Sequence, residues 1–185
     1  MKRPAVFLQI QKQYQTQSHA RRELLGKCQE ALSKAKRAIF ALHRGDQKEA
    51  DALFTQAVAL LGGVEKLFGR FPRLQEEGSY RAALEEYAEA RLFAGFLAHG
   101  RIVKLDERAS DPSVYLAGLC DATGEIVRYA TRQVTLGNNQ AVAQSMETVG
   151  MAIEFLLDLD LTGYLRTKFD QAKKNLSRLE QMTYD

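Results

Sequence analysis

The sequence predicts an all-α protein, a single-domain helical bundle of about six or seven helices. Helix-favouring Ala, Leu, Glu, Lys, Gln and Arg dominate the composition, and only three of the 185 residues are proline. No strand-length run of alternating β-branched residues occurs, so no sheet is expected. A chain of this length can bury one substantial core, and we therefore treat residues 1–185 as one domain.

The first helix is expected to be very long. Pro4 suits a helix start, and nothing from there to Arg44 breaks the helical pattern except Gly26. Apolar residues recur along it at alternating spacings of three and four, as in a coiled-coil seam: Leu25, Cys28, Leu32, Ala35, Ile39 and Leu42. Such a seam leaves more apolar surface than one thin bundle covers, so it predicts an oligomer larger than a dimer.

Turn signals divide the remaining chain into further helices. Gly45-Asp46 ends the first helix and caps a second, which runs to about Phe68, and a third is expected over about 75–105. Asp111-Pro112, an N-cap followed by proline, opens a fourth helix that runs to about 136. Beyond the turn at 137–139, a fifth helix runs to about 159. Thr162-Gly163 can separate it from a last amphipathic segment that ends near Met182.

Charge is unevenly distributed along the chain, although the net charge is only +3. Residues 1–48 hold 11 Lys or Arg and three acids, whereas the remaining residues hold 15 basic and 20 acidic groups. A basic first part suggests an anionic partner, and an acidic second part suggests cation binding. The alternative is that long solvated helices simply carry many charges.

The cellular location is expected to be cytoplasmic. The start of the chain briefly resembles a signal peptide, but its apolar run is too short and is followed by polar residues. No apolar stretch approaches the roughly 20 residues that a membrane-spanning helix needs. Two cysteines, Cys28 and Cys120, make a disulfide framework unexpected and fit a reducing compartment.

Two short segments place pairs of carboxylates one helical turn apart. Glu86 and Glu89 are spaced i,i+3, and Asp121 and Glu125 are spaced i,i+4, so each pair shares one helix face. Both segments lie in apolar sequence, where a carboxylate is costly unless it is paired or holds a cation. If the two pairs face each other across the bundle, they form an all-oxygen site of the kind that Mg²⁺ or Mn²⁺ prefers.

The same segments resemble a known family. LEEYAEA, residues 84–90, and DPSVYLAGLCDATGEIVR, residues 111–128, are similar to the helices that carry the catalytic acids of translin-associated factor X. SKAKRAIFALHR, residues 33–44, is similar to the long first helix of the translin superfamily. The match covers nearly the whole chain in the right order. It favours the factor-X branch over translin itself because the carboxylates are present.

The resemblance implies a translin-like fold and a metal-dependent endoribonuclease that acts on RNA, expected to be single-stranded. It implies catalytic roles for Glu86, Glu89 and Asp121, with Glu125 as a further ligand to Mg²⁺ or Mn²⁺. It also implies a barrel-like assembly, a hexamer or an octamer, with interior active sites. No membrane partner is expected, since no apolar stretch is long enough to span a bilayer. RNA phosphates would be held by basic side chains: Arg21, Arg22, Lys34, Lys36, Arg37, Arg44 and Arg128.

Other interpretations compete with this one. The acids can instead form solvated faces or pair with arginines, since exposed i,i+4 ion pairs are common. A non-catalytic oligomer that binds single-stranded nucleic acid, of the translin type, is the main functional alternative. A redox metalloprotein is disfavoured because its Glu-x-x-His pairs are absent. His43 and His99 sit at expected helix ends, where an interaction with the helix dipole is the simpler role.

Overall fold

The structure, a computed structural model, describes residues 3–184. This part of the chain contains six α-helices and two short 3₁₀ turns and no strand, which confirms the all-α prediction. The helices are α1 (Ala5–Arg44), α2 (Gln47–Phe68), α3 (Gly78–His99), α4 (Pro112–Thr135), α5 (Asn139–Leu157) and α6 (Gly163–Tyr184). The 3₁₀ turns are η1 (Pro72–Glu76) and η2 (Glu107–Ala109).

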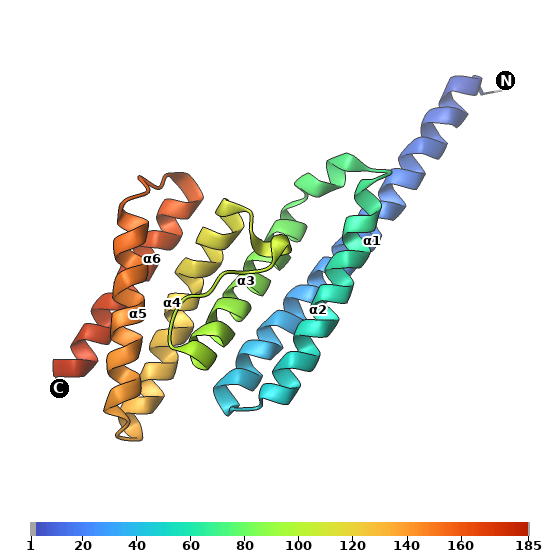
Figure 1. The fold of residues 1–185 in the computed structure, drawn as a ribbon. Coiled ribbons are helices and arrows are strands. Elements are labelled where there is room, and N and C mark those ends of the chain that lie inside the picture. The colour runs from blue at the N-terminus through green and yellow to red at the C-terminus, as the bar shows by residue number, and fades with distance from the viewer. Residues whose placement is uncertain (1–2, 185) are drawn as a thin grey trace.

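The helices lie side by side in an elongated bundle (Figure 1). α1 packs against α2 and α3, α3 packs against α4, and α4 packs against α5 and α6. The N-terminal part of α1 projects beyond its neighbours, whereas α5 and α6 form the opposite end of the molecule (Figure 1). The two helices that carry the predicted carboxylates, α3 and α4, are therefore the central pair.

Local sequence signals set most of the helix boundaries. Gly45 ends α1 in the left-handed conformation, with φ of 79°, which glycine adopts without strain. The Asp46 side chain then accepts a hydrogen bond from the Glu49 amide at the start of α2. Asp111 does the same for α4, because its carboxylate accepts from the amides of Ser113 and Val114.

The third helix differs from the sequence prediction at its C-terminal end. It stops at His99 rather than near 105, because Gly100 adopts a φ of 65° and its amide donates to the Phe96 carbonyl. The chain then folds back as an extended segment and the η2 turn before α4 begins. Val103 in this segment packs against Gly95 so closely that a Cβ on that glycine would lie 2.3 Å from Val103 Cγ2.

The predicted seam of α1 forms part of the core. Cys28, Ala35, Ile39 and Leu42 are buried, while Leu25 and Leu32 pack against the core from its edge. Small residues share the same face, because Ala31, Ala38 and Ala41 are also buried and allow neighbouring helices close approach. Within residues 3–184, every helix is too short or too polar to span a lipid bilayer.

Candidate metal centre

The two predicted carboxylate pairs face each other because α3 and α4 approach closely at one glycine. Gly118 of α4 is buried, and a Cβ there would lie 2.6 Å from Ala88 Cβ and 2.9 Å from the Glu89 amide nitrogen. Such distances mean that only glycine fits this position. The contact lies beside Glu89 on α3 and one turn before Asp121 on α4, so it sets the spacing between the two pairs.

Glu89 is at the centre of the acidic cluster. Burial, together with the negative charges of Glu86, Asp121 and Glu125, raises the pKa of its carboxyl to about 8. Glu89 forms no hydrogen bond or ion pair with any other residue in the range 3–184. A half-buried carboxyl group that is surrounded by three others and lacks a partner is costly, and a bound cation would remove that cost.

The other three carboxylates each contact a basic side chain. Glu86 Oε2 lies 3.7 Å from Lys36 Nζ, a contact between α3 and α1. Asp121 accepts a hydrogen bond from the Lys168 ammonium of α6, and Glu125 is hydrogen-bonded to the His43 ring at the end of α1. The four acids are thus brought together as the sequence predicted, but their charge is already partly neutralised.

Lys168 was not singled out from the sequence. Its ammonium lies between two acids, since it contacts Asp121 and is 3.9 Å from Glu85 Oε2. Glu85 is buried and also accepts hydrogen bonds from Arg81 Nε at 2.8 Å and from the Tyr164 hydroxyl at 2.7 Å. Nothing in the local sequence of α6 indicates this network, because it depends on how α6 packs across α3 and α4.

His43 contacts the acidic cluster in addition to lying at the predicted helix end. It lies in the last turn of α1, and its ring contacts Glu125 and lies 4.7 Å from the Phe93 ring, centroid to centroid. Its carbonyl accepts a hydrogen bond from Arg132 of α4. The imidazole therefore contacts one carboxylate of the cluster from α1, whereas Lys168 contacts another from α6.

The donor chemistry of the cluster fits a hard divalent cation, since all four groups are carboxylates on facing helices. The side chains are not arranged around an ion, because no three His, Cys, Asp or Glu side chains within residues 3–184 lie at coordination geometry. Asp121 and Glu125 would have to turn away from Lys168 and His43 to bind one. Both changes are side-chain rotations on fixed helices.

The predicted RNA-binding residues fall into two groups. Lys36, Arg44 and Arg128 lie near the acidic cluster, and Arg128 is 3.6 Å from Glu125 Oε2. Of the others, Arg21 pairs with Glu77, Lys34 with Glu30, and Arg37 with Glu49, which also pairs with Arg44, while Arg22 is exposed on the same helix. The structure therefore does not bring all seven residues to one surface.

A basic groove opens beside Glu125. It has a volume of about 920 Å³ between α1, α4 and α6. Four arginines line it together with Phe40 and Glu125: Arg44, Arg128, Arg132 and Arg178. Arg128 also lies over the Phe40 ring, 5.1 Å from its centroid. Arg44 and Arg128 were predicted from the sequence, whereas Arg132 and Arg178 come from positions with no distinguishing local pattern.

The amino-acid sequence of the chain matches one known protein family. The model of the translin family matches residues 20–185, which is most of the chain. The chain belongs to the translin family. None of the curated protein sequences matches it.

Solved structures support the translin fold. The chain is similar to apo-NeC3PO, with a TM-score of 0.87 at 22% identity, covering 98% of this chain and 97% of that one. It is also similar to AfC3PO in a duplex RNA complex, with a TM-score of 0.82 at 23% identity over 95% and 93% of the two chains. A further AfC3PO crystal structure gives 0.82 at 24% identity over 95% and 94%. At these identities the likeness establishes the fold.

Proposed function

We propose that this translin-family chain is a metal-dependent endoribonuclease, closest to the translin-associated factor X branch, that cleaves RNA phosphodiesters inside a barrel-like oligomer. The observation that carries the proposal is Glu89, a half-buried carboxyl without a partner and surrounded by three other acids. A protein that only binds RNA has no physical reason to keep such a group, because negative charge repels the phosphate backbone.

The carboxylates have the chemistry to hold Mg²⁺ or Mn²⁺: Glu86, Glu89, Asp121 and Glu125. A divalent ion bound there would activate a water molecule and neutralise charge on the phosphate that is attacked. Two neighbouring side chains, Lys168 and His43, have complementary roles. Lys168 can release Asp121 and turn its ammonium toward a phosphate oxygen, and His43 can likewise release Glu125 to a bound ion.

RNA would reach the cluster through the basic groove. Its arginines hold phosphates without reading sequence, and Phe40 offers an apolar surface against which a base can lie. The AfC3PO structure contains duplex RNA; for this chain we propose single-stranded RNA as the substrate, which an open groove of about 920 Å³ accommodates. We further propose a hexamer or octamer in the cytoplasm, a location that suits its two free, buried cysteines.

A ribonuclease assay with and without EDTA tests the proposal. Purified protein should cleave a fluorescent single-stranded RNA in Mg²⁺ or Mn²⁺, and EDTA should stop the reaction. Replacing Glu86, Glu89 or Asp121 singly with Ala should abolish cleavage while the helical fold and the assembly persist. Asp51→Ala, an exposed acid on α2, is the matched control and should keep full activity. Wild-type rates in all three cluster variants would refute the proposed catalytic site.

One observation favours the non-catalytic alternative. Lys168 and His43 already engage two of the acids, so the cluster could be a structural charge network in a protein that binds RNA without cleaving it. The same assay separates the two functions. RNA binding that is retained in EDTA, without cleavage under any divalent cation, would favour the alternative.

A further inference from the structure

The first four turns of α1 form an arm that lies outside the bundle (Figure 1). We define the N-terminal arm as residues 5–19, in which no residue is buried; Ala20 is the first buried residue of α1. Four large apolar side chains lie on one face of it at spacings of three and four: Val6, Phe7, Ile10 and Tyr14. Tyr14 is 70% exposed and Phe7 62%.

The apolar face of the arm is continuous with the face of α1 that is buried in the bundle. Ile10, Gln17 and Leu24 follow one another at intervals of seven, and Leu24 is fully buried in the bundle. The arm therefore presents the same helix face that packs against neighbouring helices further along α1. An amphipathic helix is stable when this face is covered, so the arm requires a partner helix.

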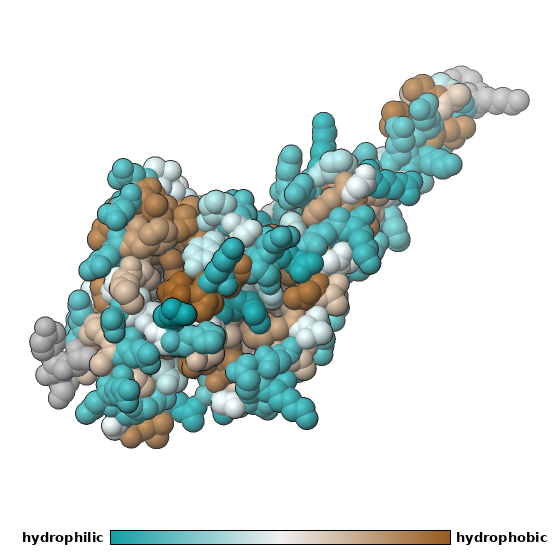
Figure 2. Space-filling view, viewed as in Figure 1, coloured by the Kyte–Doolittle hydropathy of each residue, from teal (hydrophilic) through white to brown (hydrophobic). Residues whose placement is uncertain are grey.

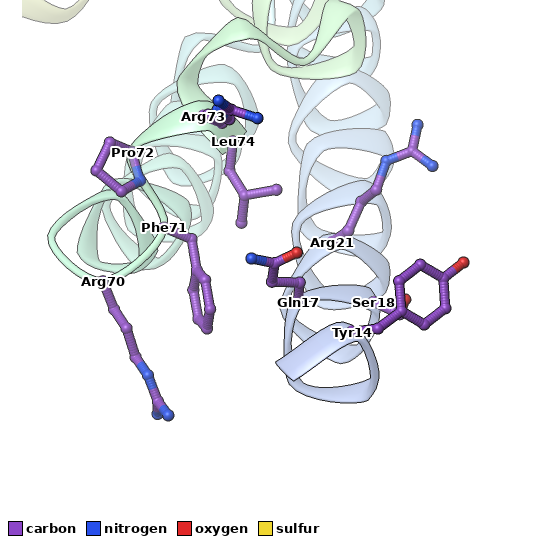
Figure 3. Close-up of a pocket in the computed structure, with 9 residues that line it drawn as sticks. All are labelled: Tyr14, Gln17, Ser18, Arg21, Arg70, Phe71, Pro72, Arg73 and Leu74. Carbon is purple, nitrogen blue, oxygen red and sulfur yellow. The ribbon is translucent and has the colours of Figure 1, made fainter. Parts of the chain in front are cut away.

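The surface at the base of the arm is basic. A cavity of about 600 Å³ lies between the arm and the turn that joins α2 to η1 (Figure 3). Phe71 and Leu74 extend into it toward Gln17, while Arg70 lies on the turn and Arg73 lies in η1 (Figure 3). Neither of these arginines forms an ion pair with a residue in the range 3–184. The chain has no acid before residue 23, so the arm itself carries only positive charge.

The outer face of α5 combines exposed apolar side chains with acidic residues, which complements the apolar and basic surface of the arm and its base. Met151 and Phe155 are 51% and 47% exposed on this face. Three acids surround them, Glu147 and Glu154 on α5 and Asp158 at its C-cap, and none of the three pairs with a cation of the described chain. No Lys or Arg occurs from residue 133 to residue 165. We call these five residues the acidic face of α5.

Contact between the two surfaces within one molecule is excluded by the fold. α1 packs on α2 and α3, whereas α5 packs on α4 and α6 at the opposite end (Figure 1). Apolar surface is visible at both of these ends of the molecule (Figure 2). The lengths also match, since the arm spans about 22 Å and the acidic face of α5 about 17 Å at 1.5 Å per residue.

From these observations we infer that the N-terminal arm of one chain docks on the acidic face of α5 of a second copy. The apolar stripe of the arm covers Met151 and Phe155, while Arg70 and Arg73 face Glu154 and Asp158. Each chain carries both surfaces at opposite ends, so the contact is head-to-tail and repeats around a closed ring. The inference rests on the self-association proposed above and specifies which surfaces produce it.

A charge exchange between two variants tests this pairing. The arm variant carries Arg70→Glu and Arg73→Glu, and the face variant carries Glu154→Lys and Asp158→Lys. In either variant alone the two surfaces have like charge and should repel, so light scattering should report the 20.8 kDa monomer at micromolar concentration. In an equimolar mixture every contact joins opposite charges, and a ring of alternating variants should form.

A control variant with Lys48→Glu and Lys104→Glu, both exposed and away from the two surfaces, should assemble like wild type. Circular dichroism confirms that each variant is folded. Assembly of both single variants would overturn the pairing while leaving self-association intact. Variants that dissociate but do not assemble when mixed would also overturn it. A wild-type monomer would overturn both the pairing and the proposed oligomer, and none of these outcomes depends on nuclease activity.

Discussion

Replacing Gly118 with Ala should separate the two helices that carry the acidic cluster. The added methyl would lie 2.6 Å from Ala88 Cβ, 2.9 Å from the Glu89 nitrogen and 3.1 Å from the Ala88 carbonyl carbon. Two of these three atoms belong to the backbone of α3 and cannot move by side-chain rotation. The helices must therefore move apart, and this displacement should be largest next to Glu89.

Overpacking of this kind costs about 1–3 kcal/mol. For a domain of this size, each kcal/mol lowers the melting temperature by roughly 2–4 °C, so a decrease of roughly 2–12 °C is expected. Thermal unfolding by circular dichroism at one fixed protein concentration measures it, because assembly makes the melting temperature concentration-dependent. Cleavage at a temperature where the variant is still folded should fall as well, since Glu89 moves away from Asp121.

Gly26→Ala is the matched control, because Gly26 lies within α1 and a Cβ there would meet no atom within 4 Å. The alanine should stabilise the helix by up to about 1 kcal/mol. The reasoning is wrong if Gly118→Ala melts at or above the wild-type temperature. In that case the close approach of α3 and α4 does not constrain the cluster.

Three further predictions concern charge and capping. The raised pKa of Glu89 means that the folded protein binds a proton that the unfolded chain releases above about pH 4.5, so stability in EDTA should fall as pH rises toward 8. Urea titrations at pH 5.5 and 8 should show a loss of about 1–3 kcal/mol that Glu89→Gln lacks; equal pH dependence in both proteins would contradict this. Asp111→Ala removes the cap of α4 and should cost about 1 kcal/mol in the same titration, whereas an unchanged midpoint would show that the cap is dispensable. RNA affinity should fall when Gln replaces four basic residues of α1, Lys34, Lys36, Arg37 and Arg44. The slope of the logarithm of the binding constant against the logarithm of the salt concentration should become shallower by up to about one unit per lost phosphate contact. An unchanged slope would mean that α1 turns these charges to solvent.

The carboxylate pairs illustrate what spacing in the sequence can establish. Because i,i+3 and i,i+4 neighbours share a helix face in any α-helix, Glu86 with Glu89 and Asp121 with Glu125 could be paired without a structure. That the two pairs meet depends on Gly118, whose importance lies in a contact with another helix. Lys168 was missed for the same reason, because its role comes from the packing of α6 across α4.

The basic residues show what the sequence could not predict, namely the surface to which each charge is presented. Composition correctly located an excess of positive charge in residues 1–48, but a count of charges has no direction in space. Lys36 lies at the cluster, whereas Arg21 is at the far end of the same helix and Lys34 pairs with Glu30. One helix of 40 residues presents its charges to several unrelated surfaces.

The sequence by itself determined the helices, most of their ends and the residues that face the core, because hydrogen bonding within a helix, capping and apolar periodicity are local properties. The early end of α3 at Gly100 required the structure, since Val103 packs against Gly95 only when the chain folds back. The tertiary structure alone decided which charges meet. Glu89 lies among three acids without a hydrogen-bond or ion-pair partner, and the arm and the acidic face of α5 lie at opposite ends of the molecule. Both arrangements result from the packing of helices that are distant in sequence, and no pattern within a single helix indicates them.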